Sequence, residues 1–185
     1  KWGPRLRQGG LFDGMKLIVD ETVCQMCRPT STEIMLLNLS GKHKLVCRKF
    51  EVGANIATGK ICWVSSAPGS VHDVQVSRSN VLLDLLPEDE RTLGDKEHVD
   101  DGLKHRTLCP RKLRPGQDAF DPLDELKNWK MGNVRVLVEH IMGRMKMFGI
   151  LSTRHRGNRQ VHHMHFRVCS KLTNSDSNTN KIRCA

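Results

Sequence analysis

The sequence lacks the features of a membrane protein and of a secreted protein. No apolar run approaches the roughly 18 to 20 residues that a membrane span requires. The longest runs are MKLIV, ICWV and VLLDLL. No initiator Met and no charged-then-apolar leader stand at the start of the sequence. We therefore expect a fragment of a longer intracellular product that does not cross a membrane.

The cysteines lack the pattern of a disulfide framework. Their number, seven, is odd, and they are scattered along the chain. Reduced thiols inside a cell are therefore expected. Four residues nevertheless have the ligand types of a tetrahedral zinc site, and a zinc-stabilised binding module is one functional hypothesis. These residues are Cys24, Cys27, His43 and Cys47.

Length and charge indicate one domain with an anionic partner. A chain of 185 residues is long enough for one domain with a hydrophobic core. Its 30 Lys and Arg residues exceed its 20 Asp and Glu residues, which gives a net charge of +10. A positive field of this size attracts polyanions such as nucleic acid.

Apolar patterning predicts a mixed α/β domain. Short apolar runs bounded by turn or acidic residues predict strands, and apolar residues recurring every three or four positions predict helices. The predicted strands span 15–19, 44–52, 61–65 and 91–93, and the predicted helices span 71–86, 134–148 (with Asn133 as the N-cap) and 161–172. The other segments are a flank over 1–14, a loop-rich insertion near 96–128 and a disordered tail over 175–185.

Three acidic residues are placed for divalent-metal chemistry. Asp20 and Asp95 follow predicted strands, and Glu139 lies on a predicted helix whose apolar stripe must pack on a sheet. If the two strands are neighbours, the three carboxylates converge and can hold Mg²⁺ or Mn²⁺. Such ions support phosphoryl displacement. For any single Asp at a strand end, a role as an ordinary loop or cap residue is the alternative.

Five motifs follow one another along the chain. They are VDET over 19–22, ICWVS over 61–65, PGSVHD over 68–73, LGDK over 93–96 and VRVLVEHIMGRMK over 134–146. In this order they resemble the motifs of the DDE superfamily endonucleases, specifically the Harbinger-type transposases and their domesticated nuclease relatives, over about residues 16–174. The most specific motif is PGSVHD, which is similar to the family's PGSxHD signature.

The resemblance implies an RNase H-like α/β fold over residues 15–174, with a mixed sheet of about five strands flanked by helices. It implies that Asp20, Asp95 and Glu139 form a catalytic triad that holds Mg²⁺ or Mn²⁺, with Asp73 as a further metal ligand. The implied function is a metal-dependent endonuclease domain that cleaves DNA phosphodiester bonds, from a transposon or a domesticated transposase. A nuclear location and a separate DNA-binding partner protein follow from the same resemblance.

Three residues depart from the family pattern beside the proposed ligands. Glu21 stands where the family has Gly after the first Asp. Glu97 and His98 stand where it has Gly and Tyr, and the chain contains no Tyr. These departures support an alternative function, a catalytically decayed transposase-derived domain that binds DNA or other proteins.

Basic residues supply candidate DNA contacts. Arg135 and Lys146 are predicted to contact phosphate beside Glu139, and a helical Arg135–Glu139 salt bridge is the alternative. Arg154 and Arg156 lie in a basic loop that is predicted to follow a DNA backbone. Three nearby histidines are interpreted as a surface cluster and not as a metal site: His162, His163 and His165.

Overall fold

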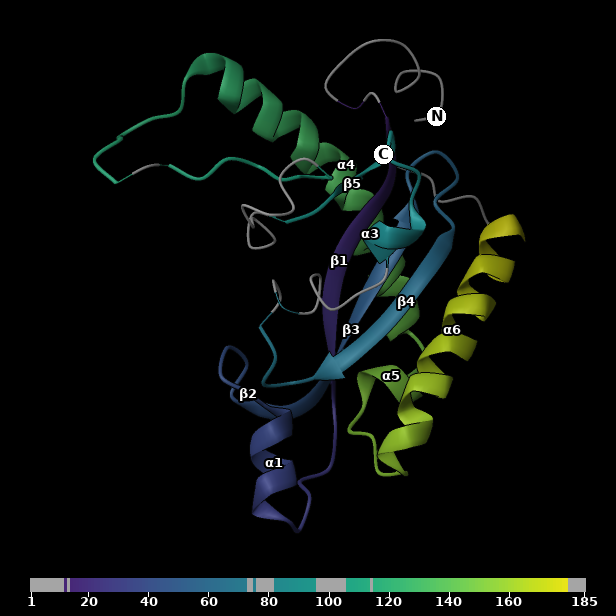
Figure 1. Cartoon of the computed structure of the whole chain (residues 1–185). Coiled ribbons are helices and arrows are strands. Elements are labelled where there is room, and N and C mark those ends of the chain that lie inside the picture. The colour runs from purple at the N-terminus through teal and green to yellow at the C-terminus, as the bar shows by residue number, and fades with distance from the viewer. Residues whose placement is uncertain are drawn as a thin grey trace.

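The structure is a computed structural model that describes residues 12, 14–72, 75, 82–95, 106–113 and 115–179. A mixed six-stranded sheet carries the fold (Figure 1). Its strands are β1 (Met15–Gln25), β2 (Leu39–Ser40), β3 (Leu45–Asn55), β4 (Ile61–Pro68), β5 (Arg91–Leu93) and β6 (Thr107–Leu108). The helices are α1 (Thr32–Asn38), α3 (Leu82–Leu85), α4 (Pro122–Lys146), α5 (Gly149–Ser152) and α6 (Arg159–Thr179).

Strand β1 lies in the middle of the sheet. The strand order is β2-β3-β1-β5-β6, and β4 also pairs with β3. Strand β3 runs antiparallel to β1, β2 and β4, whereas β5 runs parallel to β1 and β6. The mixed sheet flanked by helices agrees with the predicted RNase H-like fold class. Within the described residues, no helix is both long enough and apolar enough to cross a membrane.

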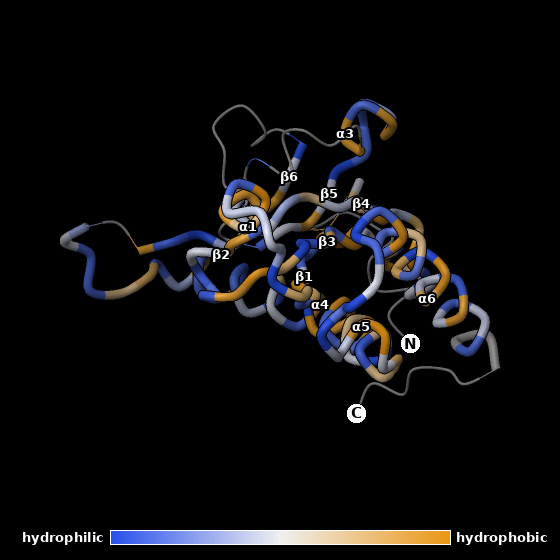
Figure 2. The backbone as a smooth tube through the Cα atoms, turned by 90° about the horizontal axis from the view of Figure 1, so that it is seen from below, coloured by the Kyte–Doolittle hydropathy of each residue, from blue (hydrophilic) through white to orange (hydrophobic). Residues whose placement is uncertain are grey.

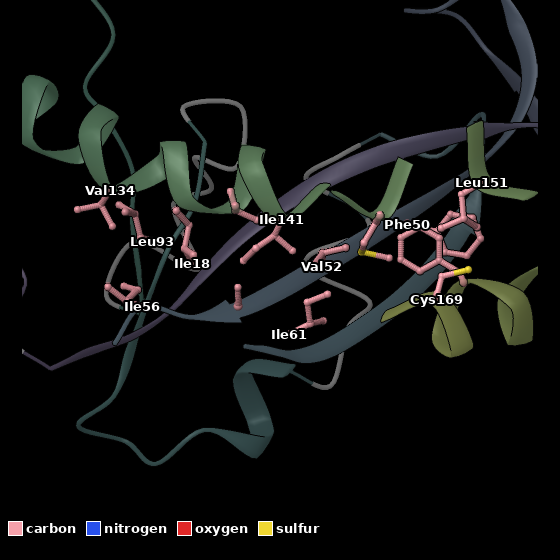
Figure 3. Close-up of a cluster of buried hydrophobic side chains, with 14 of the residues drawn as sticks. Ile18, Phe50, Val52, Ile56, Ile61, Leu93, Val134, Ile141, Leu151 and Cys169 are labelled. Carbon is pink, nitrogen blue, oxygen red and sulfur yellow. The ribbon is translucent and has the colours of Figure 1, made fainter. Parts of the chain in front are cut away.

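Helices cover both faces of the sheet (Figure 2). Helices α4, α5 and α6 lie on one face and α3 lies on the other. Side chains alternate between the faces of a strand, so alternate residues of β1 and β3 face α4. Those that enter the main core are Ile18, Cys24, Phe50, Val52 and Ala54. Figure 3 shows Ile18, Phe50 and Val52 of the strands facing Ile141 of α4 and Cys169 of α6. A smaller cluster on the opposite face contains Leu17, Val19 and Leu82.

Helix α4 begins at Pro122, so the predicted start at Val134 with Asn133 as its cap is wrong. The side chain of Asp121 caps the helix by accepting a hydrogen bond from Leu123 N, and proline stands in the first turn. Both features favour a helix start. The sequence pattern missed them because Gly132 and several polar residues interrupt the apolar stripe of the first turns.

The other predicted bounds differ in smaller ways. Strand β1 continues past Asp20 to Gln25, because its pairing with β3 extends from Leu17 opposite Asn55 to Gln25 opposite Cys47. Helix α3 lies within the helix predicted over 71–86, of which 73–74 and 76–81 are outside the described residues. Helix α6 reaches Thr179, in the segment for which the sequence predicts a disordered tail.

The predicted surface cluster of histidines is wrong for His162. Its side chain is fully buried, because α6 turns this face toward the sheet. The ring stacks on His155 with centroids 4.1 Å apart and meets Phe50 edge-on at 5.3 Å. Among the residues that the structure describes, neither ring nitrogen of His162 has a hydrogen-bond partner. His162 is therefore a core residue with two unsatisfied polar atoms.

Candidate active site

The pairing of β1 with β5 brings two acidic side chains together. In this parallel pair Ile18 lies opposite Leu93, and both side chains are fully buried beneath α4. Because side chains alternate between faces, Asp20 and Asp95, each two residues further on, return to the same face. The acids therefore lie between the sheet and α4, as the prediction of neighbouring strands requires.

Arg135 of α4 joins the two acids. Its Nη1 lies 2.9 Å from Asp95 Oδ1, and its Nη2 lies 3.6 Å from Asp20 Oδ2. The three side chains are only 18% to 24% exposed, so water screens these ion pairs incompletely. The planar guanidinium carries several donors and can contact two carboxylates at once. Arg135 thus pairs with Asp20 and Asp95, which differs from the helical pairing with Glu139 that the sequence offered.

Glu139 lies one helical turn beyond Arg135. Four residues along an α-helix correspond to about 40° of rotation and about 6 Å of rise, so both side chains belong to one side of α4. Glu139 is exposed to solvent. In the described part of the chain, no three His, Cys, Asp or Glu side chains form a group that could hold a metal ion. The structure therefore groups Asp20 and Asp95 but does not bring Glu139 into a three-ligand cluster with them.

The other acids of the predicted site lie elsewhere. Asp73, Glu97 and His98 are outside the described residues. Glu21 lies directly opposite Glu51 of β3 and therefore on the face of the sheet away from α4. On that face Trp63 Nε1 donates a hydrogen bond of 2.9 Å to Glu51 Oε1. The carboxylate of Glu21 thus points away from the Asp20–Asp95 pair.

Cys109 is a neighbour of this site that the sequence analysis did not identify. The pKa of its thiol is raised to about 11, chiefly by burial and next by the negative charge of Asp95. The thiol is therefore protonated at neutral pH. Cys109 follows β6, whose pairing places Leu108 beside Leu93. The sequence predicts a loop-rich insertion in this segment. It therefore gives no sign that β6 pairs with β5 and brings Cys109 close to Asp95.

Lys146, at the C-terminal end of α4, forms hydrogen bonds with other elements of the fold. Its Nζ donates hydrogen bonds to Val23 O, to Leu151 O (3.3 Å) and to Cys24 Sγ (3.3 Å). These contacts tie α4 to β1 and α5. The ammonium group that the sequence predicts to contact phosphate is thus surrounded by acceptors from the protein.

Lys146→Met tests whether Lys146 stabilises the fold or contacts a DNA phosphate. We expect the free energy of unfolding to fall by about 1–3 kcal/mol, because hydrogen bonds from a charged donor to partly buried acceptors are lost. The salt dependence of DNA binding should stay unchanged. Denaturant unfolding and DNA titrations at several salt concentrations measure both quantities. Lys130→Met, at an exposed position of α4, is the control, and unchanged stability with a weaker salt dependence would contradict the structural role.

The predicted zinc ligands do not form a site. Cys24 and Cys47 are buried free thiols and Cys27 is an exposed one. His43 is exposed. Burial raises the pKa of the Cys24 and Cys47 thiols, which disfavours the thiolate form that binds metal. No metal-holding group occurs among the described residues, so the structure does not bring these four side chains together as a zinc site, and the zinc-stabilised module stays an untested hypothesis.

The basic loop lies beyond the end of β1. Arg154 and Arg156 are exposed and line a pocket of about 480 Å³ together with His165. Between the two arginines, His155 is buried and bridges to Met26. The structure therefore fixes the backbone of this loop while leaving its guanidinium groups accessible to an anion.

Comparison with protein families, curated proteins and solved structures gives a match at the level of a family. A family model described as DDE superfamily endonuclease matches residues 19–174. Neither the curated proteins nor the solved structures contain a match to the chain. The matched segment includes Asp20, Asp95, Arg135 and Glu139 together with the basic loop.

Proposed function

The chain belongs to the DDE superfamily endonucleases, and from this premise we propose that it is a transposase-type DNA endonuclease domain of the Harbinger kind that depends on divalent metal. The observation that carries the proposal is the pair of carboxylates on neighbouring parallel strands, both held by Arg135 of α4. A nuclear location and a separate DNA-binding partner protein are part of the same proposal.

The donor set of this site fits Mg²⁺ or Mn²⁺. Carboxylate oxygens are the hard ligands that these ions accept, and Mg²⁺ in phosphoryl-transfer sites commonly takes one or two carboxylates plus phosphate oxygens and water. Asp20 and Asp95 supply two such carboxylates around one cationic group. Asp20, Asp95 and Glu139 are the proposed ligands, with Asp73 as a further one. When bound, the ions activate water or a hydroxyl group and stabilise the leaving oxygen.

The residues of the chain have distinct tasks in this reaction. Asp20 and Asp95 concentrate negative charge at one point, and Arg135 neutralises it in the metal-free chain. Once released from these carboxylates, the guanidinium is placed to pair with the phosphate of the DNA strand, a contact that planar bidentate donors favour. Glu139 on the next turn can then add a third carboxylate, and Arg154 and Arg156 hold the backbone further along the strand.

Arg135→Gln tests whether Arg135 and a divalent ion compete for the same carboxylates. We expect the metal-free variant to be less stable by about 1–3 kcal/mol, because two partly buried carboxylates then lack their common cation. Mn²⁺ should raise the melting temperature of the variant more than that of the parent, since no guanidinium has to be displaced. Differential scanning fluorimetry with and without Mn²⁺ measures both effects.

The control for this experiment is Arg111→Gln. It removes an ion pair with Asp124 in which the arginine is 64% exposed, so it should alter neither stability nor the response to Mn²⁺ by much. A Mn²⁺ response in Arg135→Gln equal to or smaller than that of the parent would contradict the competition.

A decayed domain that only binds DNA or proteins is the second candidate. Two observations favour it: the described residues contain no three-ligand group, and Arg135 already pairs with the two acids. This candidate predicts DNA binding with a steep salt dependence and no cleavage with Mg²⁺ or Mn²⁺. Metal-dependent nicking that disappears in Asp20→Asn would exclude it.

A further inference from the structure

A second, smaller pocket lies on the other side of the basic loop. Its volume is about 210 Å³, and it is lined by residues 26–31, by Ile34 of α1, by His155 and Gly157, and by Arg159, the first residue of α6. It shares His155 and Gly157 with the larger pocket of Arg154 and Arg156. Six strand residues at about 3.3 Å each separate Asp20 from Met26 at its edge, about 20 Å in all, so this pocket is distinct from the acid pair.

Backbone hydrogen bonds hold the wall of this pocket in a fixed position. His155 N donates to Gln25 O and Cys27 N donates to His155 O, both at 2.9 Å, which locks the loop to the end of β1. The His155 ring is held against the buried ring of His162. Gly157 permits a close approach, because a Cβ there would lie 3.2 Å from His155 Nε2. The pocket wall is therefore fixed by main-chain pairing and ring stacking.

The charged side chains that line this pocket are all positive. Two arginines, Arg28 and Arg159, line it, and no Asp or Glu is among its lining residues. Arg159 Nη1 is buried and has no hydrogen-bond partner among the described residues. Arg28 Nε donates to Met35 Sδ at 2.9 Å, and a thioether is a weak acceptor. A buried guanidinium donor without an acceptor, such as Arg159 Nη1, is costly, and an anion would satisfy it.

The size and position of the pocket indicate which anion it takes. Its volume is below the roughly 300 Å³ of pockets that enclose drug-sized ligands, so it suits one small group and not a whole nucleotide. Hydroxyl groups of Thr30 and Ser31 add to the polar lining. Arginine pairs favourably with the oxygens of a phosphate group, and the neighbouring pocket is also lined by exposed arginines.

We propose that the pocket between Arg28 and Arg159 binds a phosphate group of a DNA strand, and that this strand continues past Arg154 and Arg156. The assignment to DNA rests on the proposed function, whereas the affinity of the pocket for phosphate does not. Free phosphate offers the same chemistry, so the test contains one arm for each source.

The variants are Arg28→Gln, Arg159→Gln and the double substitution. The control is Arg167→Gln, which removes the same charge from an exposed position of α6 that does not line the pocket. In the first arm, thermal unfolding is followed with inorganic phosphate against chloride at equal ionic strength. In the second arm, the affinity for a DNA duplex is measured between low and high salt.

We expect phosphate to raise the melting temperature of the parent and of Arg167→Gln, and to raise it less in the pocket variants. The slope of log affinity against log salt concentration is negative for a protein that contacts phosphates. In the double variant this slope should be less steep by about 0.9, the amount for one phosphate contact. Arg28 is exposed, so Arg28→Gln should fold. This variant tests the pocket on its own if Arg159→Gln does not fold.

Two results would overturn the proposal. Equal responses to phosphate in the parent and the pocket variants would show that the pocket does not bind phosphate. A reduced phosphate response with a DNA salt slope equal to that of Arg167→Gln would overturn the assignment to DNA. If the parent does not bind DNA, the proposed function fails, while the phosphate arm still decides the pocket.

Discussion

Asp20→Asn and Asp95→Asn will each reduce Mn²⁺-dependent nicking of duplex DNA by at least about 10²–10³-fold, the usual loss when one preorganised electrostatic group is removed from an active site. Each substitution removes a negative charge from the pair that Arg135 joins, and an amide is a poorer ligand for a hard divalent ion. A plasmid-nicking assay with Mn²⁺, performed on folded variants, measures the loss.

Two further substitutions make this result specific. Asp118→Asn, at an exposed position outside the site, should nick at the rate of the parent. Glu139→Gln should lose as much activity as the Asp variants if the exposed Glu139 joins the acid pair when DNA and metal bind. Nicking that survives in Asp20→Asn and Asp95→Asn would contradict the assigned site, and the activity would then come from elsewhere.

The free energy of unfolding will fall as the pH is lowered from about 6.5 to about 4, by roughly 3 kcal/mol from His162 alone. The pKa of His162 is lowered from 6.5 to about 4, chiefly by burial and in smaller part by the nearby positive groups of His155, Arg48, His165 and Lys146. In this pH range the unfolded chain binds a proton that the folded chain excludes. Protonation therefore favours unfolding, and the stability contributed by neutral His162 is present above pH 6.5 and lost as the pH falls toward 4.

Denaturant unfolding at several pH values measures this effect in the parent and in His162→Leu. The variant should show a shallower fall between pH 6.5 and pH 4, because the titrating group is gone. Part of the slope should remain, since burial also lowers the pKa of His163. His43→Gln, at an exposed position, should keep the slope of the parent. Equal slopes in His162→Leu and the parent would show that His162 does not exclude a proton on folding.

Local patterns in the sequence predict which residues belong to this site but not how they pair. The ends of the predicted strands locate Asp20 and Asp95, although β1 continues to Gln25, and the ordered motifs identify the family. The helical spacing also places Arg135 at the border of the apolar stripe of α4. Its partners could not be predicted, because they depend on the parallel register of β1 and β5, which joins residues far apart in the sequence. For the same reason the spacing offered Glu139, a neighbour within the helix, as a partner of Arg135.

Burial explains why the predicted surface position of His162 is wrong. The segment around His162 is rich in polar and basic residues, which favours an exposed position. In the fold, α6 packs on β4 and α4, and every third or fourth residue of α6 turns inward. His162 and Phe166 share this inward face. The spacing of residues in the sequence shows the period of the helix, but it does not show which polar residue is buried in the core.

Isothermal titration of Mn²⁺ into the parent chain and into folded Asp20→Asn and Asp95→Asn tests the central claim most directly. The claim is that these two carboxylates, joined by Arg135 in the metal-free chain, form the divalent-metal site of a DNA endonuclease. The account predicts specific Mn²⁺ binding by the parent that weakens in both variants. Absence of specific binding by the parent, or binding that both variants retain, would contradict it.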